Sequence, residues 1–272
     1  MKLKLKWDFK KVFRNVLWTL LAVAFIITVG FTDTRRHEML CSGLNISIND
    51  TTGNYFIDRN DILRTVEDKF GKLRGKLLRN INTALLESII NSNAFVARAE
   101  VFSTADGKLS IEVKQRNPVM RVINGSNESF YVDDEGAFMP LSEKYSADVT
   151  VANGFIPNTF AQKKIRTFTR EESADTSAHL SLLEELFVLN QFIGTHEFWN
   201  AQIEQMYVND EGDIELVPRV GNHIIVFGDT QNMTEKFDKL FHFYTEGLNH
   251  TGWNQYKIIN LKFKDQVVCT KK

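Results

Sequence analysis

One uncharged run, from Val16 to Phe31, constrains this chain more than any other stretch of its sequence. As an α-helix that rises about 1.5 Å per residue, the run and its flanks would cross the ~30 Å hydrocarbon layer of a membrane. A helix is favoured there because it satisfies its own backbone hydrogen bonds in lipid. We therefore predict a transmembrane helix over residues 16–33. Its membrane-anchor side chains are Val16, Leu17, Trp18, Leu20, Leu21, Phe25, Ile26, Ile27 and Val29.

A cleaved signal peptide is the alternative interpretation of this run, because a secretory signal also carries a short apolar core. Such a signal ends in small residues at its cleavage site. Here Gly30-Phe31-Thr32-Asp33 follows, without an Ala-x-Ala pattern. We therefore favour an uncleaved anchor.

The charges on either side of the run predict its orientation. Several basic residues and only one acidic residue, Asp8, precede the run, and Arg35 and Arg36 follow it. By the positive-inside rule, residues 1–15 form a short cytoplasmic tail, and the chain from about Thr32 onward lies outside the cytoplasm. The basic residues of the tail are Lys2, Lys4, Lys6, Lys10, Lys11 and Arg14.

Composition limits the classes of function that remain. The 272 residues carry a formal net charge of −1, so no global basic field indicates a nucleic-acid partner. A hydrophobic content of 43% suits packed globular domains. The two cysteines, Cys41 and Cys269, could pair only if the fold brought them within bridging distance, and two unpaired thiols are the simpler interpretation.

Residues 44–115 predict a small α+β module with the element order β-α-α-β-β. Leu44–Asn49 alternates apolar and polar residues, as a half-buried strand does. Asp58 suits the N-cap of a first helix, and a second helix begins at about Asn82. A hairpin with Asp-Gly in its turn follows, so two helices would cover one face of a three-stranded sheet. The second helix would face inward with Leu85, Leu86, Ile89 and Ile90.

Residues 116–272 predict a second, β-rich domain with flanking helices, which completes an α+β chain. Short apolar runs between turn sequences indicate several strands before residue 155. A helix is expected at about 178–192, and three strands follow it within 202–227. A last helix would begin at Asn232, with Glu235 in a capping box, and end at Gly247.

No catalytic constellation is recognisable in the sequence. It lacks the Gly-x-Ser-x-Gly, His-Glu-x-x-His and phosphate-binding Gly-Lys-Ser/Thr patterns, and no two histidines stand four residues apart. The acidic cluster Asp133-Asp134-Glu135-Gly136 could bind a cation or act as an acid/base pair. The same residues are expected in a tight turn between strands. We therefore predict no metal site and no cofactor.

An enzyme is nevertheless the alternative function. A type II membrane-anchored glycosyltransferase or hydrolase would share the predicted topology, and the chain contains several Asn-x-Ser/Thr sequences. Asp133 and Asp134 would then form its metal or acid/base site. Against this alternative, the sequence shows no Asp-x-Asp pattern and no nucleotide-binding βαβ pattern.

The end of the chain predicts a short terminal strand over residues 266–269. A last strand at a sheet edge has unpaired backbone groups, which can accept a strand from a partner. Phe263 could then serve as a hydrophobic anchor beside it. The alternative is that Val267 and Val268 simply complete the core.

The order of these features resembles the FtsQ/DivIB family of bacterial cell-division proteins, in the version found in Bacteroidetes. The basic tail, the single span and the β-α-α-β-β module, of the kind called POTRA, are similar to that family. Ile111 to Val119 resembles its strand before x-Pro-x, and Tyr131 to Leu141 its Asp-x-x-Gly-x-x-x-Pro hairpin. Trp253 to Phe263 resembles its late strand, although Asn260, Lys262 and Phe263 replace the usual Asp, Arg and Tyr.

The resemblance implies a scaffold rather than a catalyst. It implies a single-pass type II protein of the bacterial inner membrane, with a periplasmic C-terminal part at the division septum. Family members link early and late division proteins and help to regulate septal peptidoglycan synthesis. They bind FtsB-like and FtsL-like proteins, which add a strand to the sheet edge near the C-terminus. FtsW/FtsI-like proteins are further components of the same assembly. The partner-binding residues implied here are Tyr256, Ile259, Leu261, Lys262, Phe263, Lys264, Gln266, Val267 and Val268.

The module alone would also suit an outer-membrane assembly or translocation chaperone. Such proteins usually carry several of these modules or a barrel, and we find neither pattern in the sequence. A division scaffold without a small-molecule substrate is therefore the expected function.

Overall fold

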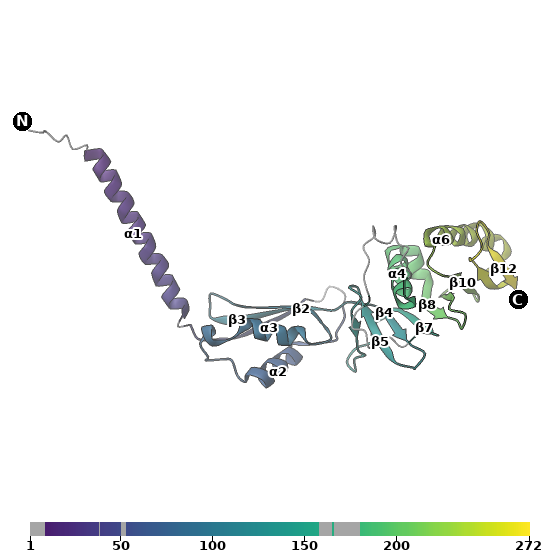
Figure 1. Ribbon diagram of the computed structural model, residues 1–272, viewed down its shortest axis with the longest axis horizontal. Helices are drawn as coiled ribbons and strands as arrows, with labels where there is room; N and C mark the ends of the chain where they lie inside the picture. The colour runs from purple at the N-terminus through teal and green to yellow at the C-terminus, as the bar shows by residue number, and fades with distance from the viewer. Residues whose placement is uncertain (1–8, 38, 50–52, 158–164, 166–179) are drawn as a thin grey trace, which may run out of the picture. The chain divides into compact units, whose positions relative to one another are not determined.

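The computed structural model describes residues 9–37, 39–49, 53–157, 165 and 180–272 (Figure 1). The chain divides into two compact units. The first comprises Met1–Asn49 and Asp58–Lys114, and the second comprises Asp50–Ile57 and Gln115–Lys272. Both cysteines are free thiols.

The predicted N-terminal helix is part of α1, which runs from Phe9 to His37. Its described side chains, from Phe13 to Ile27, are all exposed, and that of Val29 lies outside the described residues. Within the described part of the chain, no helix combines the length and the apolar composition that crossing a membrane requires.

The rest of the first unit has the predicted β-α-α-β-β order. Its sheet has the strand order β1-β3-β2, and β1 is parallel to β3. Helix α2 packs against β1 and α3. A single 3₁₀ turn, Leu78–Asn80, precedes α3. The elements are β1 (Gly43–Asn49), α2 (Arg59–Phe70), α3 (Thr83–Asn91), β2 (Val96–Ser103) and β3 (Lys108–Gln115).

Local hydrogen bonds explain where these helices begin. The Asp58 side chain accepts from the backbone N–H groups of Asn60 and Asp61, while the Asp61 carboxylate accepts from the Asp58 N–H, which forms a capping box. The predicted cap at Asp58 is therefore confirmed. The inward prediction for Leu85 is wrong, because its side chain is 49% exposed and the core covers only the stripe of α3 that carries Leu86 and Ile90.

The second unit is built on a nine-stranded sheet with the order β12-β11-β10-β9-β8-β7-β4-β5-β6. Strands β8, β9 and β10 form the predicted antiparallel meander. The strands are β4 (Pro118–Ile123), β5 (Ser129–Asp133), β6 (Phe138–Met139), β7 (Thr150–Gly154), β8 (Ile203–Val208), β9 (Ile214–Pro218), β10 (Ile224–Gly228), β11 (Tyr256–Asn260) and β12 (Val268–Lys271).

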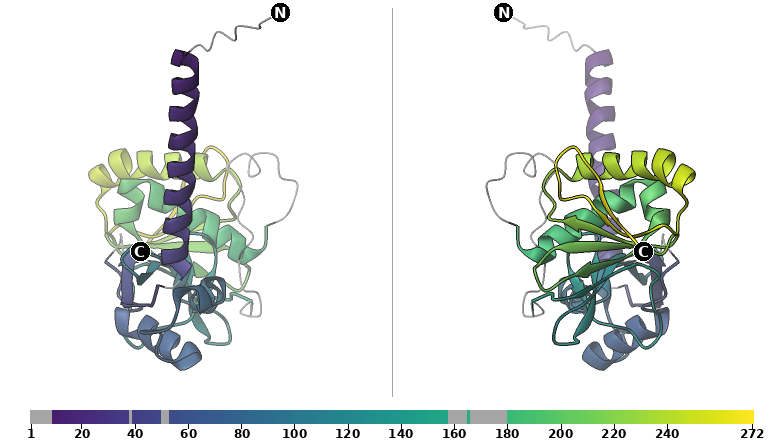
Figure 2. Two further views of the ribbon diagram at one scale, coloured as in Figure 1. Left: turned by 90° about the vertical axis from the view of Figure 1, so that its left-hand side faces the viewer. Right: turned by 90° about the vertical axis from the view of Figure 1, so that its right-hand side faces the viewer.

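Helices cover one face of this sheet (Figure 2). Strands β7 and β8 are parallel neighbours, as are β10 and β11, so each pair needs a crossover connection. Both crossovers step along the sheet in the same direction, and right-handed crossovers therefore place their helices on the same face. The helical segments are α4 (Leu182–Thr195), α5 (Glu197–Gln202), α6 (Met233–His242), the π-helical turn η3 (Phe243–Leu248) and α7 (Asn249–Thr251).

Two predictions for these helices are corrected by the structure, and a third falls partly outside the described residues. The described part of α4 begins at Leu182, after a capping box between Ser181 and Glu184, and the predicted start at 178 lies outside the described residues. Asn232 does precede α6, but its backbone is left-handed and its side chain makes no capping bond. The last helical segment continues past Gly247 through a π-helical turn.

Candidate partner-binding edge

Strand β12 forms one edge of the nine-stranded sheet. It is antiparallel to β11, with Cys269 opposite Ile259 and Val268 opposite Asn260. Within the described chain no strand pairs with its other side, so the backbone groups there are free to bind a partner strand. The strand begins two residues later than predicted, at Val268 instead of Gln266.

Side chains alternate across this edge strand. Val267 and Cys269 pack against the core, and burial raises the pKa of the Cys269 thiol. Val268 is 40% exposed, and Thr270 is exposed as well. The interpretation that the valines complete the core therefore applies to Val267, whereas Val268 offers an apolar surface.

Helix α6 holds the turn that leads into β12. The Lys239 ammonium donates hydrogen bonds to the backbone oxygens of Leu261 (3.3 Å) and Phe263 (2.6 Å). Asp265 has a positive φ of 58°, so the chain reverses there toward β12. This bracing leaves the Phe263 side chain 46% exposed beside the edge strand.

Lys262 is engaged within the fold. Its ammonium lies 2.5 Å from an Asp213 carboxylate oxygen, and this hydrogen bond raises the pKa of Lys262. The side chain crosses Gly228, where an added Cβ would come within 2.9 Å of its Cγ. The Lys262 side chain therefore stabilises the fold near the sheet edge. A partner carboxylate could bind its ammonium group only by competing with Asp213.

The structure sorts the expected partner-binding residues into two groups. Ile259 and Leu261 are fully buried in the core, and Tyr256 packs against Phe243 with ring centroids 5.7 Å apart. These three support the edge but offer little surface, so we leave them out of the candidate site. The exposed members are Lys262, Phe263, Lys264, Gln266 and Val268, whereas Val267 is half-buried against the core and belongs to neither group.

Two residues of the edge strand were missed by the sequence analysis. Thr270 and Lys271 continue β12 beyond the predicted end at Cys269. The β-branched residues Val267, Val268 and Thr270 could have indicated the longer strand, because such residues favour strands.

Comparison with known proteins decides the family. A family model described as FtsQ/DivIB, C-terminal related, matches residues 117–270, which is more than half of the chain. The chain belongs to the FtsQ/DivIB family. A POTRA-like domain model also matches residues 39–114. No curated protein matches the chain.

FtsQ/DivIB membership indicates a cell-division scaffold that works through protein partners. This agrees with the resemblance noted in the sequence, at the level of the family and its two domains. An edge strand near residue 270 falls within the matched C-terminal region.

The acidic cluster of the enzyme alternative has a structural role in this FtsQ/DivIB domain. Asp133 is fully buried and lies 2.6 Å from the Arg116 guanidinium. Its other oxygen accepts from the backbone N–H groups of Glu135 and Ala137. The carboxylate is thus committed to an ion pair and a turn, as the turn interpretation predicted.

Neither β-α-β crossover of the sheet carries a glycine-rich phosphate-binding sequence after its first strand. The structure does contain two β-α-β units, which the sequence analysis missed. Their first strands, β7 and β10, end at Gly154 and Gly228, and the residues that follow, Phe155-Ile156-Pro157 and Asp229-Thr230-Gln231, form no glycine-rich phosphate loop. Among the described residues, no group of three acidic, histidine or cysteine side chains could hold a metal ion.

A buried histidine lies beneath the C-terminal end of this FtsQ/DivIB domain. His223 Nε2 lies 2.8 Å from the Tyr244 hydroxyl, and its Nδ1 has no partner among the described residues. Burial lowers the pKa of His223, and the nearby charge of Lys272 lowers it further. Burial also raises the pKa of Tyr244, so both groups are neutral in the folded state near pH 7.

We expect this histidine to make the domain less stable in acid. The unfolded chain binds a proton at His223 near its ordinary pKa of about 6.5, whereas the folded chain resists that proton. The free energy of unfolding should therefore fall as the pH drops below that value. The urea midpoint of the wild type should decrease more between pH 7.5 and pH 5.5 than that of His223→Gln. His250→Gln, at an exposed position, should behave like the wild type. An equal decrease in all three proteins would contradict this assignment.

Proposed function

We propose that this protein is a bitopic divisome scaffold that binds FtsB-like and FtsL-like proteins by strand addition to β12. In this role it links early and late division proteins, including FtsW/FtsI-like components, and regulates septal peptidoglycan synthesis. The observation that carries the proposal is the unpaired side of β12, flanked by the exposed side chains of Phe263 and Val268. A partner strand would gain backbone hydrogen bonds from the edge and apolar contacts from these two residues.

The proposal includes a membrane anchor formed by residues 16–33 of α1. Two observations support it: the run from Val16 to Phe31 carries no charge, and the described side chains of Phe13 to Ile27 are exposed rather than packed in a core. With the basic tail of residues 1–15 in the cytoplasm, the POTRA module (44–115) and the β-domain (116–272) would lie in the periplasm at the septum.

A pull-down of two chains tests the proposed function. The full chain should capture FtsB-like and FtsL-like proteins from membranes of the source organism, identified by mass spectrometry. A chain that ends at Phe263 lacks β12 and should lose both. Capture by neither chain, or equal capture by both, would overturn the strand-addition mechanism.

A point variant separates binding from folding, because the truncation also removes Val267 and Cys269 from the core. Phe263→Glu should weaken partner binding about 30-fold, the effect of losing a hot-spot aromatic side chain worth about 2 kcal/mol. Phe155→Glu is the matched control, since Phe155 is 60% exposed and follows β7, far along the sheet from β12. The affinity of purified partner should be measured by biolayer interferometry. Equal affinities of the two variants would remove Phe263 from the interface.

A further inference from the structure

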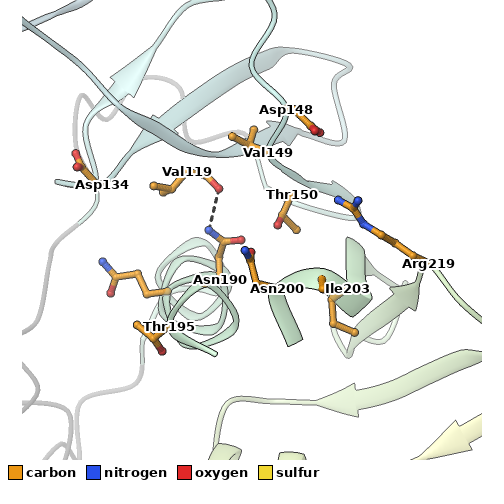
Figure 3. A pocket seen from close by; sticks show the side chains of 13 residues that line it. Val119, Asp134, Asp148, Val149, Thr150, Asn190, Thr195, Asn200, Ile203 and Arg219 are labelled. Atoms are coloured by element: carbon orange, nitrogen blue, oxygen red, sulfur yellow. Dashed lines mark hydrogen bonds between the residues drawn. The ribbon is translucent and has the colours of Figure 1, made fainter. Parts of the chain in front are cut away.

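A polar cavity of about 770 Å³ opens in the β-domain away from β12 (Figure 3). It lies where the first residues of β4, β7 and β8 meet the C-terminal half of α4 and the short helix α5. In the sheet, β7 is separated from β12 by four strands. Its volume is in the range of sites that bind small ligands.

Side-chain amides dominate one wall of the cavity. Asn190 is only 6% exposed, and its Nδ2 donates to the backbone oxygen of Val119 at 2.9 Å. Its Oδ1 has no donor among the described residues. Figure 3 shows Asn190, Asn200 and Thr150 gathered around the same space. This oxygen is not among the fully buried atoms that lack a hydrogen-bond partner, so it is open to the space of the cavity and can accept from a ligand that carries an N–H or O–H group.

Charged groups lie at opposite sides of the cavity. Asp134 lies at one side and Arg219 at the other in Figure 3, and Asp148 adds a second carboxylate. No described residue forms an ion pair or hydrogen bond with the Arg219 guanidinium. This arrangement suits a ligand that has a positive and a negative end.

The lining excludes other common ligand classes. Among the described lining residues there is no aromatic side chain on which a sugar ring or a nucleobase could stack. Of the lining residues that the structure describes, Arg219 alone is basic and two are carboxylates, which disfavours a polyphosphate. Side-chain amides offer both a donor and an acceptor, as a peptide bond does, and Val119, Val149 and Ile203 leave apolar patches for small side chains.

We propose that this cavity binds a short peptide with a free amino group and a free carboxylate. The carboxylate pairs with Arg219, the amino group faces Asp134, and the amides of Asn190 and Asn200 bind the peptide backbone. This site is separate from the strand-addition edge, so a test of peptide binding can fail without affecting the proposed function, and the reverse also holds.

Isothermal titration of the purified full chain with the tripeptide Ala-Ala-Ala tests the proposal. The peptide with both ends free should bind, and its C-terminal amide should bind about tenfold more weakly, because it lacks the charge-assisted contact to Arg219. Arg219→Gln should weaken binding of the free peptide by a similar factor. The free and amidated peptides should then bind this variant with equal affinity. Arg121→Gln is the matched control, since Arg121 lies on β4 outside the cavity and bonds Ser129. Asn200→Leu, which leaves the charges in place, should weaken both forms equally.

Three results would overturn the proposal. The first is the absence of binding at millimolar peptide. The second is equal binding of the free and amidated peptides to the wild type. The third is binding of N,N′-diacetylchitobiose or pyrophosphate, tested in parallel, in place of the peptide.

Discussion

Replacing Gly154 with alanine should destabilise the β-domain by at least about 3 kcal/mol, through steric overlap combined with backbone strain. Gly154 ends β7 with a φ of 103°, in the left-handed region that favours glycine. A Cβ at this position would overlap the backbone oxygen of Val208 and approach the Tyr207 ring at 3.0 Å. Strand β7 pairs on both sides, with β4 and β8, so it cannot shift away. Urea unfolding followed by the fluorescence of the buried Trp199 measures the loss.

Gly212 provides the control for this substitution. It has a similar φ of 88°, but no atom lies within 4 Å of the added Cβ. Gly212→Ala should therefore cost only about 1 kcal/mol, from backbone strain alone. If both variants lose the same stability, the close approach of β7 and β8 is not what Gly154 provides.

Asp133→Ala should cost the β-domain about 3–5 kcal/mol, because removing one partner of a buried ion pair leaves the other uncompensated. The Arg116 side chain would keep its charge with little access to water. The N–H groups of Glu135 and Ala137 would also lose their acceptor. The free energy of unfolding of the full chain, from the same urea assay, provides the measurement.

Asp134→Ala is the control, because it removes a negative charge from the same turn but leaves the Asp133–Arg116 ion pair in place. Asp134 is the exposed neighbour of Asp133, and its replacement should change stability by less than about 0.5 kcal/mol. If both variants lose a similar free energy of unfolding, the turn acts through its total negative charge and the specific Asp133–Arg116 pair is not what matters.

Features set by neighbouring residues were predictable from the sequence. The cap at Asp58 and the hairpin around Asp106-Gly107 both formed as expected. Each depends on hydrogen bonds or turn conformations within a few residues, so a short pattern contains the information. The failed capping box at Asn232 shows the limit. There the Glu185 carboxylate, 45 residues away in the sequence, accepts from the Thr230 N–H, and Lys236 of α6 binds Asp229, so contacts other than an Asn232 cap hold the loop.

Features that depend on distant residues were not predictable. The sequence did not indicate that β7 would pair in parallel with both β4 and β8. Nor did it place residues 53–57 in the second unit, where Gln115 binds the backbone of Asn54 and Ile57. For the candidate site, the terminal strand was predictable, but the burial of Ile259 and Leu261 followed only from the packing of helices on the sheet.

The charges beside the open edge bear on which strands could pair with it. An unpaired strand is a template for any second strand, including β12 of another copy. Lys264 and Lys272 flank this strand, Lys271 is its last residue, and all three are exposed. If two such edges met, their ammonium groups would come within a Debye length of about 8 Å and repel each other. A foreign strand that carries carboxylates at these positions would meet attraction instead. We therefore expect these lysines to disfavour pairing with a second copy relative to such a partner, and higher salt should weaken this preference.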